Sequence, residues 1–184
     1  NILAPIEVLH CTASDCTGQI DVNVIESGAS GVSLGSRVKL SIGLDGLPLI
    51  AYEHIEVTDV DEDVKVTHCL TITCDSYDVP VVVEQSSRIA GSSMTMGRDG
   101  KSIIVFVETN PGQNNHKVFT VKCWNVNCSG ARTIAYIENN TRNTEVAIGA
   151  DSMPVLFYKK QGAPGTGRIA KCGSSNCLPY WTRR

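Results

Sequence analysis

Arg37-Val-Lys-Leu-Ser-Ile-Gly-Leu-Asp-Gly-Leu-Pro-Leu-Ile-Ala-Tyr52 contains two apolar segments joined by a turn signal, and Val64-Lys-Val-Thr-His-Cys69 and Cys74 follow it. Gly, Asp, Asn and Ser separate short apolar segments, which is the spacing of consecutive strands and turns. The segment from Val64 alternates apolar and polar residues, as in a strand with one wet face. A strand covered on both faces is predicted where the chain is almost uniformly apolar, at Leu47 to Tyr52, Ile103 to Val107 and Met153 to Tyr158.

The same phrase recurs along the chain, so the sequence is a repeat array. The expected units are a half repeat over 1–36, repeat 1 over 37–90, repeat 2 over 91–143 and a shortened repeat 3 over 144–184. Each full unit has four predicted strands, and the half repeat supplies equivalents of the third and fourth. We therefore expect an all-β fold: a β-propeller-like array of four-stranded antiparallel blades, about three and a half repeats and fourteen strands, each repeat with a C-x4-C disulfide.

Asp45-Gly46 and Asp99-Gly100 predict tight type I′ hairpins between first and second strands. Asp151-Ser152 stands at the third such position and predicts a looser turn. Pro48 and Pro154 are expected at the first residues of their strands, where a missing N–H costs little.

Eight cysteines form four pairs of identical C-x4-C spacing, and the first cysteines of successive pairs lie 58, 54 and 49 residues apart. Equivalent points of neighbouring blades are well separated, so each pair is expected to close on itself, with other pairings or metal ligation as the alternatives. Oxidised cysteines predict a secreted, extracellular protein. The predicted disulfides are Cys11 with Cys16, Cys69 with Cys74, Cys123 with Cys128, and Cys172 with Cys177.

Composition limits the function classes. The net charge of −3 gives no electrostatic reason to expect nucleic acid as a partner, and no apolar run is long enough to span a membrane. The chain has no initiator Met and no signal peptide, so Asn1 is expected to be a processed start, with a piece of a longer protein as the other reading. Asn139-Asn140-Thr141 is a glycosylation sequon, predicted at Asn139 in a loop after a fourth strand.

The phrase Gly43-Leu-Asp-Gly-Leu-Pro-Leu-Ile-Ala-Tyr52, with the later Val64 to Cys69 segment and its C-x4-C partner, resembles repeats of large secreted or surface proteins that form β-propellers. The resemblance covers nearly the whole chain at repeat level and is weaker in the third unit. It implies an extracellular repeat fold, and it brings no catalytic residues with it.

No residue pattern points to catalysis, so the chain is predicted not to be an enzyme and to need no cofactor. His10 and His68 precede first cysteines where Lys122 and Lys171 stand in the other units, which favours polar strand ends over ligands. His54 and His116 are expected in loops, and Lys159-Lys160 is expected to be solvated. Two further patterns are the arginines Arg37, Arg98 and Arg142, as a guess at an acidic-sugar site, and the acidic stretch from Asp59 to Asp63, for which a solvated loop is favoured over Ca²⁺.

Two functions from different classes remain. The first is a structural or adhesion module that self-associates through open blade edges into an oligomer or filament, since unpaired strands are open to complementary edges. Two chains supply about twenty-eight strands, enough for a seven-bladed ring. The alternative is a glycan-binding lectin, which Trp124 and Trp181 do not favour because neither recurs at a repeated position.

Overall fold

The structure is a computed structural model that describes residues 5–27, 32–34, 37–56, 62–86, 88–109, 115–161, 166–178 and 180–183. Fifteen strands lie within these residues. They are β1 (Ile6–Cys11), β2 (Ile20–Glu26), β3 (Val32–Leu34), β4 (Lys39–Ile42), β5 (Pro48–Glu56), β6 (Glu62–His68), β7 (Val81–Ser86), β8 (Ile89–Met96), β9 (Ser102–Glu108), β10 (Lys117–Cys123), β11 (Arg132–Asn139), β12 (Thr141–Ile148), β13 (Pro154–Lys160), β14 (Thr166–Cys172) and β15 (Tyr180–Arg183).

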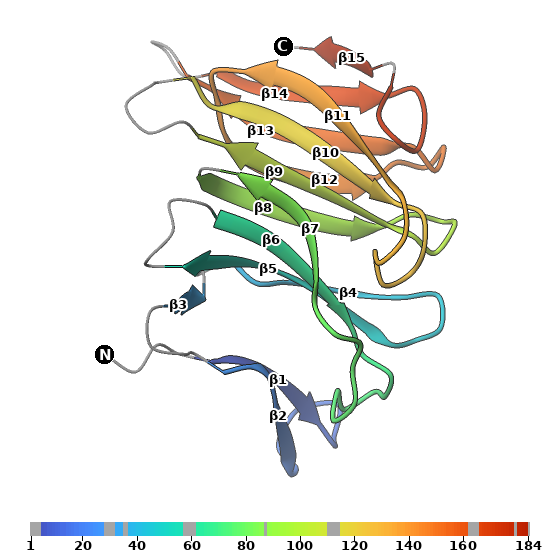
Figure 1. The fold of residues 1–184 in the computed structure, drawn as a ribbon. Helices are drawn as coiled ribbons and strands as arrows, with labels where there is room; N and C mark the ends of the chain where they lie inside the picture. The colour runs from blue at the N-terminus through green and yellow to red at the C-terminus, as the bar shows by residue number, and fades with distance from the viewer. Residues whose placement is uncertain are drawn as a thin grey trace.

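The strands form antiparallel sheets that stack in chain order from one end of the molecule to the other (Figure 1). The β1–β2 hairpin stands at one end, and we call it the half blade. Blade 1 has the order β4–β5–β6–β7, with the short β3 also on β5; blade 2 is β8–β9–β10–β11 and blade 3 is β12–β13–β14–β15. The prediction of four-stranded blades preceded by two strands is confirmed, with β3 as a strand that the sequence did not signal.

One turn recurs between the first two strands of each blade. In blade 1 the Gly43 N–H donates to the Leu47 carbonyl at 2.8 Å, and the Gly46 N–H donates to the Gly43 carbonyl at 3.0 Å. Gly46 has φ of 79°, whereas Asp45 is not among the positive-φ residues, so the expected type I′ turn is wrong. A type I turn followed by one left-handed residue closes the hairpin, and the Asp45 carboxylate accepts the Leu47 N–H.

The third such turn is also not looser than the others. Gly149 donates to Met153 at 2.9 Å, and Ser152 donates to Gly149 at 2.9 Å, which is the blade 1 pattern. Ser152 takes the left-handed conformation at φ of 69° in place of glycine. The turn geometry is therefore conserved across the repeats at the cost of a strained non-glycine residue.

Each C-x4-C segment closes on itself and adopts one shared conformation. The disulfides join Cys11 to Cys16, Cys69 to Cys74, Cys123 to Cys128, and Cys172 to Cys177. The second cysteine of each pair is left-handed, with φ between 55° and 61°, and its N–H donates to the carbonyl three residues earlier. The loop joins the third and fourth strands, and the disulfide closes the first part of this loop onto the end of the third strand.

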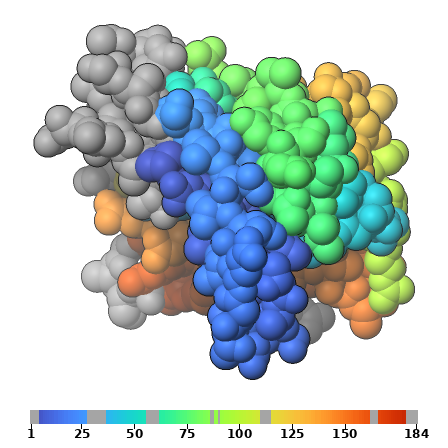
Figure 2. Space-filling view, turned by 90° about the horizontal axis from the view of Figure 1, so that it is seen from below, coloured from blue at the N-terminus to red at the C-terminus, as the bar shows by residue number. Residues whose placement is uncertain are grey.

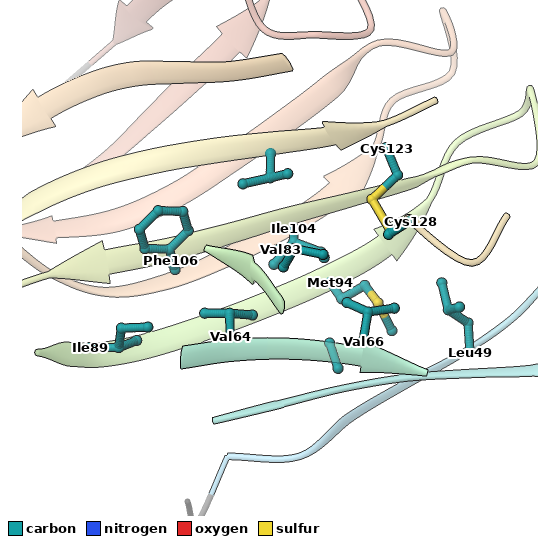
Figure 3. Close-up of a cluster of buried hydrophobic side chains, with 12 residues drawn as sticks. Leu49, Val64, Val66, Val83, Ile89, Met94, Ile104, Phe106, Cys123 and Cys128 are labelled. Atoms are coloured by element: carbon teal, nitrogen blue, oxygen red, sulfur yellow. A yellow bond between two sulfur atoms is a disulfide. The ribbon is translucent and has the colours of Figure 1, made fainter. Parts of the chain in front are cut away.

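The core lies between blades, not inside any one of them. Leu49, Val66 and Val83 from blade 1 pack against Ile104 and Phe106 from blade 2 (Figure 3). A second cluster joins blade 2 to blade 3, and a smaller one joins the half blade to blade 1. β5 and β9 are covered on both faces as predicted, because each of their blades has a neighbour on either side.

A bulge recurs near the end of the last strand of the half blade, of blade 1 and of blade 2, each of which packs on a following blade. The register shifts place one extra residue in β2, β7 and β11, opposite β1, β6 and β10. A bulge brings two successive residues to one side of a strand. Consequently Ile25, Val83 and Ile137 are buried between blades, and the glutamates that follow them face the same junctions. These glutamates are Glu26, Glu84 and Glu138.

Three expectations about position change. β8 begins at Ile89 and β12 begins at Thr141, so the predicted unit boundaries at 90 and 143 fall inside the first strands of the following blades. His54 lies in β5 and is buried, not in a loop. Lys159 and Lys160 lie in β13, where Lys160 bonds Glu138. Pro48 and Pro154 begin β5 and β13, as expected.

Candidate functional site

The end of the blades that carries the disulfides also carries a repeated polar pair. His68 Nε2 lies 2.9 Å from the Asp45 carboxylate, Lys122 Nζ lies 2.8 Å from that of Asp99, and Lys171 Nζ lies 2.5 Å from that of Asp151. The residue before each first cysteine thus reaches the hairpin aspartate of its own blade. His10 has no such hairpin and lies 3.9 Å from Asp21. These side chains hold the blade together and do not form a shared site.

At the opposite end, the bulge glutamates join neighbouring blades. Glu138 accepts hydrogen bonds from Tyr158 Oη at 2.5 Å, from Arg168 Nη1 at 2.7 Å and from Lys160 Nζ. Burial alone raises the pKa of the Glu138 carboxyl, but the bonds from Lys160 and Tyr158 and the charges of Lys160 and Arg168 hold that pKa below its ordinary value. The carboxylate is therefore ionised and ties blade 2 to blade 3.

The half blade is attached to blade 1 in the same way. Tyr52 Oη donates to Glu26, Lys65 Nζ lies 3.1 Å from the same carboxylate, and His54 Nε2 lies 3.3 Å from it. Burial and the Glu26 carboxylate raise the pKa of Tyr52 well above its ordinary value, so Tyr52 acts as a hydrogen-bond donor. Strict strand alternation does not predict this carboxylate at the junction, because the bulge places Glu26 on the same side of β2 as Ile25.

Polar side chains also gather on the first strands of the blades and on β5 beside them. Glu53 is 3% exposed and bonds Arg37 at 3.4 Å and Ser92 at 3.3 Å, and burial raises its pKa despite Arg37. Ser93, which follows Ser92 in β8, donates from Oγ to Glu145 of β12 at 2.8 Å. The exposed Glu145 also lies 3.7 Å from Lys39, so this charged pair faces solvent beside the first strands.

Both ends of the blade stack are apolar and uncovered within the described residues. On the half blade, Leu9 pairs with Val22 and Cys11 with Ile20, so their side chains share the face that points away from blade 1. Leu9 is 60% exposed, and Ile20, Val22 and Val24 are exposed beside it. Figure 2 looks onto this end and shows the half blade, in blue, projecting toward the viewer.

The other end of the stack is the outer face of blade 3. Phe157 pairs with Ile169 across β13 and β14, and Phe157 is 50% exposed. Val105 occupies the equivalent position in blade 2 and is fully buried by blade 3. The expectation that β13 is covered on both faces is therefore wrong, because no further blade of the described chain packs on it.

The other predicted site residues do not come together. Arg37 bonds Glu53, Arg98 donates to the Ala150 carbonyl, and Arg142 lies by His116, so the three arginines form no triad. Asp59 to Asp61 lie outside the described residues. Glu62 and Asp63 belong to β6, where Glu62 accepts the Ile89 N–H at 2.6 Å.

Three further residues are placed individually. Asn139 is exposed and is the last residue of β11, not part of a longer loop, and its glycosylation stays a prediction. Trp124 is exposed within its disulfide loop and donates to Thr133 at 3.1 Å. Trp181 lies in β15, the last strand of blade 3.

Two kinds of feature are absent from the described residues. No three His, Cys, Asp or Glu side chains among them are grouped so as to hold a metal ion. No helix among them has the length and apolar character needed to cross a membrane.

Comparison with solved structures places the chain among β-propeller-like folds. A family-43 β-1,3-galactosidase is 12% identical with a TM-score of 0.56, over 86% of this chain and 33% of its own. A thermostable family-43 glycoside hydrolase is 12% identical with a TM-score of 0.58, over 91% of this chain and 67% of its own. The chain thus spans about a third of the length of the galactosidase. These likenesses show the fold alone.

A fucose lectin from Kordia zhangzhouensis is 8% identical, over 79% of this chain and 96% of its own, but its TM-score of 0.49 is too low to carry an argument. No protein-family model matches the chain. No curated protein matches its sequence.

The comparison overturns one prediction. The chain was expected not to be an enzyme because it lacks familiar catalytic motifs. Two of the structures that share its fold are glycoside hydrolases, so that prediction is wrong: neither the fold nor the missing motif excludes catalysis.

Proposed function

We propose that this protein is an extracellular β-propeller-like module that self-associates through the two ends of its blade stack. One observation carries the proposal: the half blade and blade 3 each expose an apolar sheet face of the kind that is buried at the junctions inside the chain. Exposed apolar patches of this kind mark interaction surfaces. The four disulfides fit the extracellular location.

The two faces are related as successive blades are. We call the face of a blade that points toward the following blade its outer face, and the opposite face its inner face. At every junction inside the chain, the outer face of one blade packs on the inner face of the next. The uncovered face of blade 3 is such an outer face, and the uncovered face of the half blade is the opposite kind. The half blade of a second copy therefore continues the stack on blade 3, which is a head-to-tail contact.

Charge supports the same pairing. Exposed Glu7 lies two residues before Leu9 in β1, on the same face of the strand. Exposed Lys159 lies two residues after Phe157 in β13, also on the same face. Opposite charges at the edges of two apolar faces favour one orientation of approach. A repeated contact of this kind closes a ring or extends a filament, and a ring of two copies holds six full blades and two half blades.

Association is expected to raise the mass in solution above the 19.8 kDa of one chain. Changing Leu9→Asp or Phe157→Asp buries an unpaired charge in the contact and is expected to weaken association by about a hundredfold. Light scattering coupled to size-exclusion chromatography measures both effects. Val79→Asp is the control, since Val79 is exposed and precedes β7 in blade 1, which contributes to neither face. A parent chain that stays monomeric at high concentration contradicts the proposal.

We also propose a carbohydrate as a ligand of the first strands. The support is the shared fold with two glycoside hydrolases, together with the solvent-facing Glu145 and Lys39, since carboxylates and ammonium groups bond sugar hydroxyls. A β-1,3-linked galactobiose is the first ligand to test, by calorimetry and by galactose release. Glu145→Gln is expected to weaken binding by about tenfold, and exposed Asp75→Asn is the control. This second proposal is contradicted if both variants bind galactobiose equally, or if the parent does not bind it.

A further inference from the structure

The junction between blades 1 and 2 lacks the polar partners found at the other two junctions. At those junctions a bulge glutamate meets a tyrosine hydroxyl and two basic side chains. The residues are Tyr52, His54 and Lys65 around Glu26, and Tyr158, Lys160 and Arg168 around Glu138. Counted from the repeated turn, Phe106 is the equivalent of Tyr52 and Glu108 is the equivalent of His54. Counted back from the first cysteine, Phe119 is the equivalent of Lys65. These three residues of blade 2 are the ones that face Glu84. The glutamate is present at this junction, whereas the tyrosine hydroxyl and both basic side chains are absent.

Glu84 nevertheless faces blade 2. Its neighbour Val83 belongs to the same buried cluster as Phe106, against which Phe119 packs. Burial raises the pKa of the Glu84 carboxyl, Arg132 lowers it and Glu108 raises it further, and Arg132 and Glu108 both belong to blade 2. Among the described residues no hydrogen bond or ion pair joins Glu84 to a cation.

Aromatic rings lie on the side of blade 2 that faces this junction. Phe106 and Phe119 are stacked, with centroids 5.5 Å apart and planes at 16°. Tyr136 follows at 5.6 Å from Phe119 on the next strand. Tyr136 is 47% exposed, so the ring series runs from the core to the surface. Aromatic faces attract cations through the negative potential above the ring.

We propose that this junction is a binding site for an organic cation, an ammonium or guanidinium group, held between the Glu84 carboxylate and the ring series Phe106–Phe119–Tyr136. The internal repeat supports the choice of ligand, because the equivalent glutamates at both other junctions bind basic side chains. A bound cation supplies the positive charge for Glu84 that Lys65 and Arg168 supply at the other junctions and that Phe119 does not. The rings supply the attraction that a desolvated cation needs on its other side.

The test uses the whole chain and three blocked amino acids: N-acetyl-lysine methylamide, N-acetyl-arginine methylamide and the neutral norleucine analogue. Titration followed by NMR is expected to shift the Tyr136 and Phe119 ring signals with the two basic probes and not with norleucine. Glu84→Gln keeps the shape and removes the charge, so it is expected to weaken binding by about tenfold. Exposed Asp75→Asn also removes one carboxylate, lies in the loop after Cys74 outside the proposed sites, and is expected to bind like the parent.

A second variant tests the site independently. Phe119→Lys places in blade 2 the basic residue that blade 1 carries at Lys65, so an internal cation fills the site and binding of both probes is lost. Circular dichroism verifies that each variant is folded. The proposal is overturned if Glu84→Gln or Phe119→Lys, once folded, binds like the parent, or if norleucine shifts the same signals equally.

Discussion

Replacing Cys123 and Cys128 together by alanine will lower the free energy of unfolding by about 4 kcal/mol, whereas the same change at Cys11 and Cys16 will lower it by about 2 kcal/mol. The two loops have the same length, so opening either disulfide releases the same unfolded-chain entropy, about 2 kcal/mol. The difference arises from burial. Cys123 and Cys128 are fully buried in the cluster between blades 1 and 2, and removing each sulfur leaves a cavity worth about 1 kcal/mol.

Urea denaturation of the two double variants measures this difference. Cys11 is half-buried and Cys16 is exposed on the half blade, which packs on one neighbour only, so their replacement leaves no comparable cavity. Equal losses for the two pairs would show that the disulfides act through the unfolded chain alone. A larger loss at the half blade would contradict the assignment of the core to the blade junctions.

The second large effect is expected at Glu138. Glu138→Gln keeps the side-chain shape but leaves Lys160 and Arg168 without their carboxylate, and we expect a loss of about 2 kcal/mol at neutral pH. Breaking a partly buried ion pair costs more than a surface pair because the remaining cations stay desolvated. Thermal unfolding and urea denaturation measure the loss.

Glu84→Gln is the matched control, because Glu84 occupies the equivalent place without such partners. Its carboxyl loses more solvation than it gains in pairing, so the amide is expected to be neutral or slightly stabilising at pH 7. A loss at Glu84 as large as that at Glu138 would contradict the partner assignments.

The two carboxyls also predict opposite pH dependences. The folded pKa of Glu138 lies below its ordinary value of 4.5, so its contribution is present above pH 4.5 and is lost as pH falls through the folded pKa. The folded pKa of Glu84 lies above 4.5, so its unfavourable contribution appears as pH rises from 4.5 through that folded pKa. The stability difference between each variant and the parent, measured from pH 3 to 8, checks both signs.

The repeat, the strands and the disulfide loops could be predicted because each leaves a local signal. An Asp-Gly pair, an apolar run and a C-x4-C segment are short patterns whose meaning does not depend on distant residues. The prediction of type I′ hairpins was nevertheless wrong. The type I′ prediction rested on the conformational freedom of glycine alone, whereas the Asp45 carboxylate accepts the Leu47 N–H and so favours a type I turn.

The junction glutamates were missed for a different reason. Strict alternation puts Ile137 and Glu138 on opposite faces of a strand, whereas the bulge puts both on the face toward blade 3. The repeated apolar-Glu pair at Ile25, Val83 and Ile137 was the signal that could have revealed it. The exposure of Phe157 could not be predicted, because the apolar sequence of β13 resembles that of the buried strands β5 and β9. Whether such a strand is buried depends on whether another blade packs on it.

The head-to-tail contact is tested most directly by mixing two single variants. Leu9→Asp blocks the half blade and leaves blade 3 intact, and Phe157→Asp does the reverse. Each alone is expected to have the mass of one chain, and their equimolar mixture is expected to form a particle of two chains through the two intact faces. Light scattering of the mixture decides the matter. A mixture that keeps the mass of one chain, while the parent associates, contradicts the pairing of the half blade with blade 3.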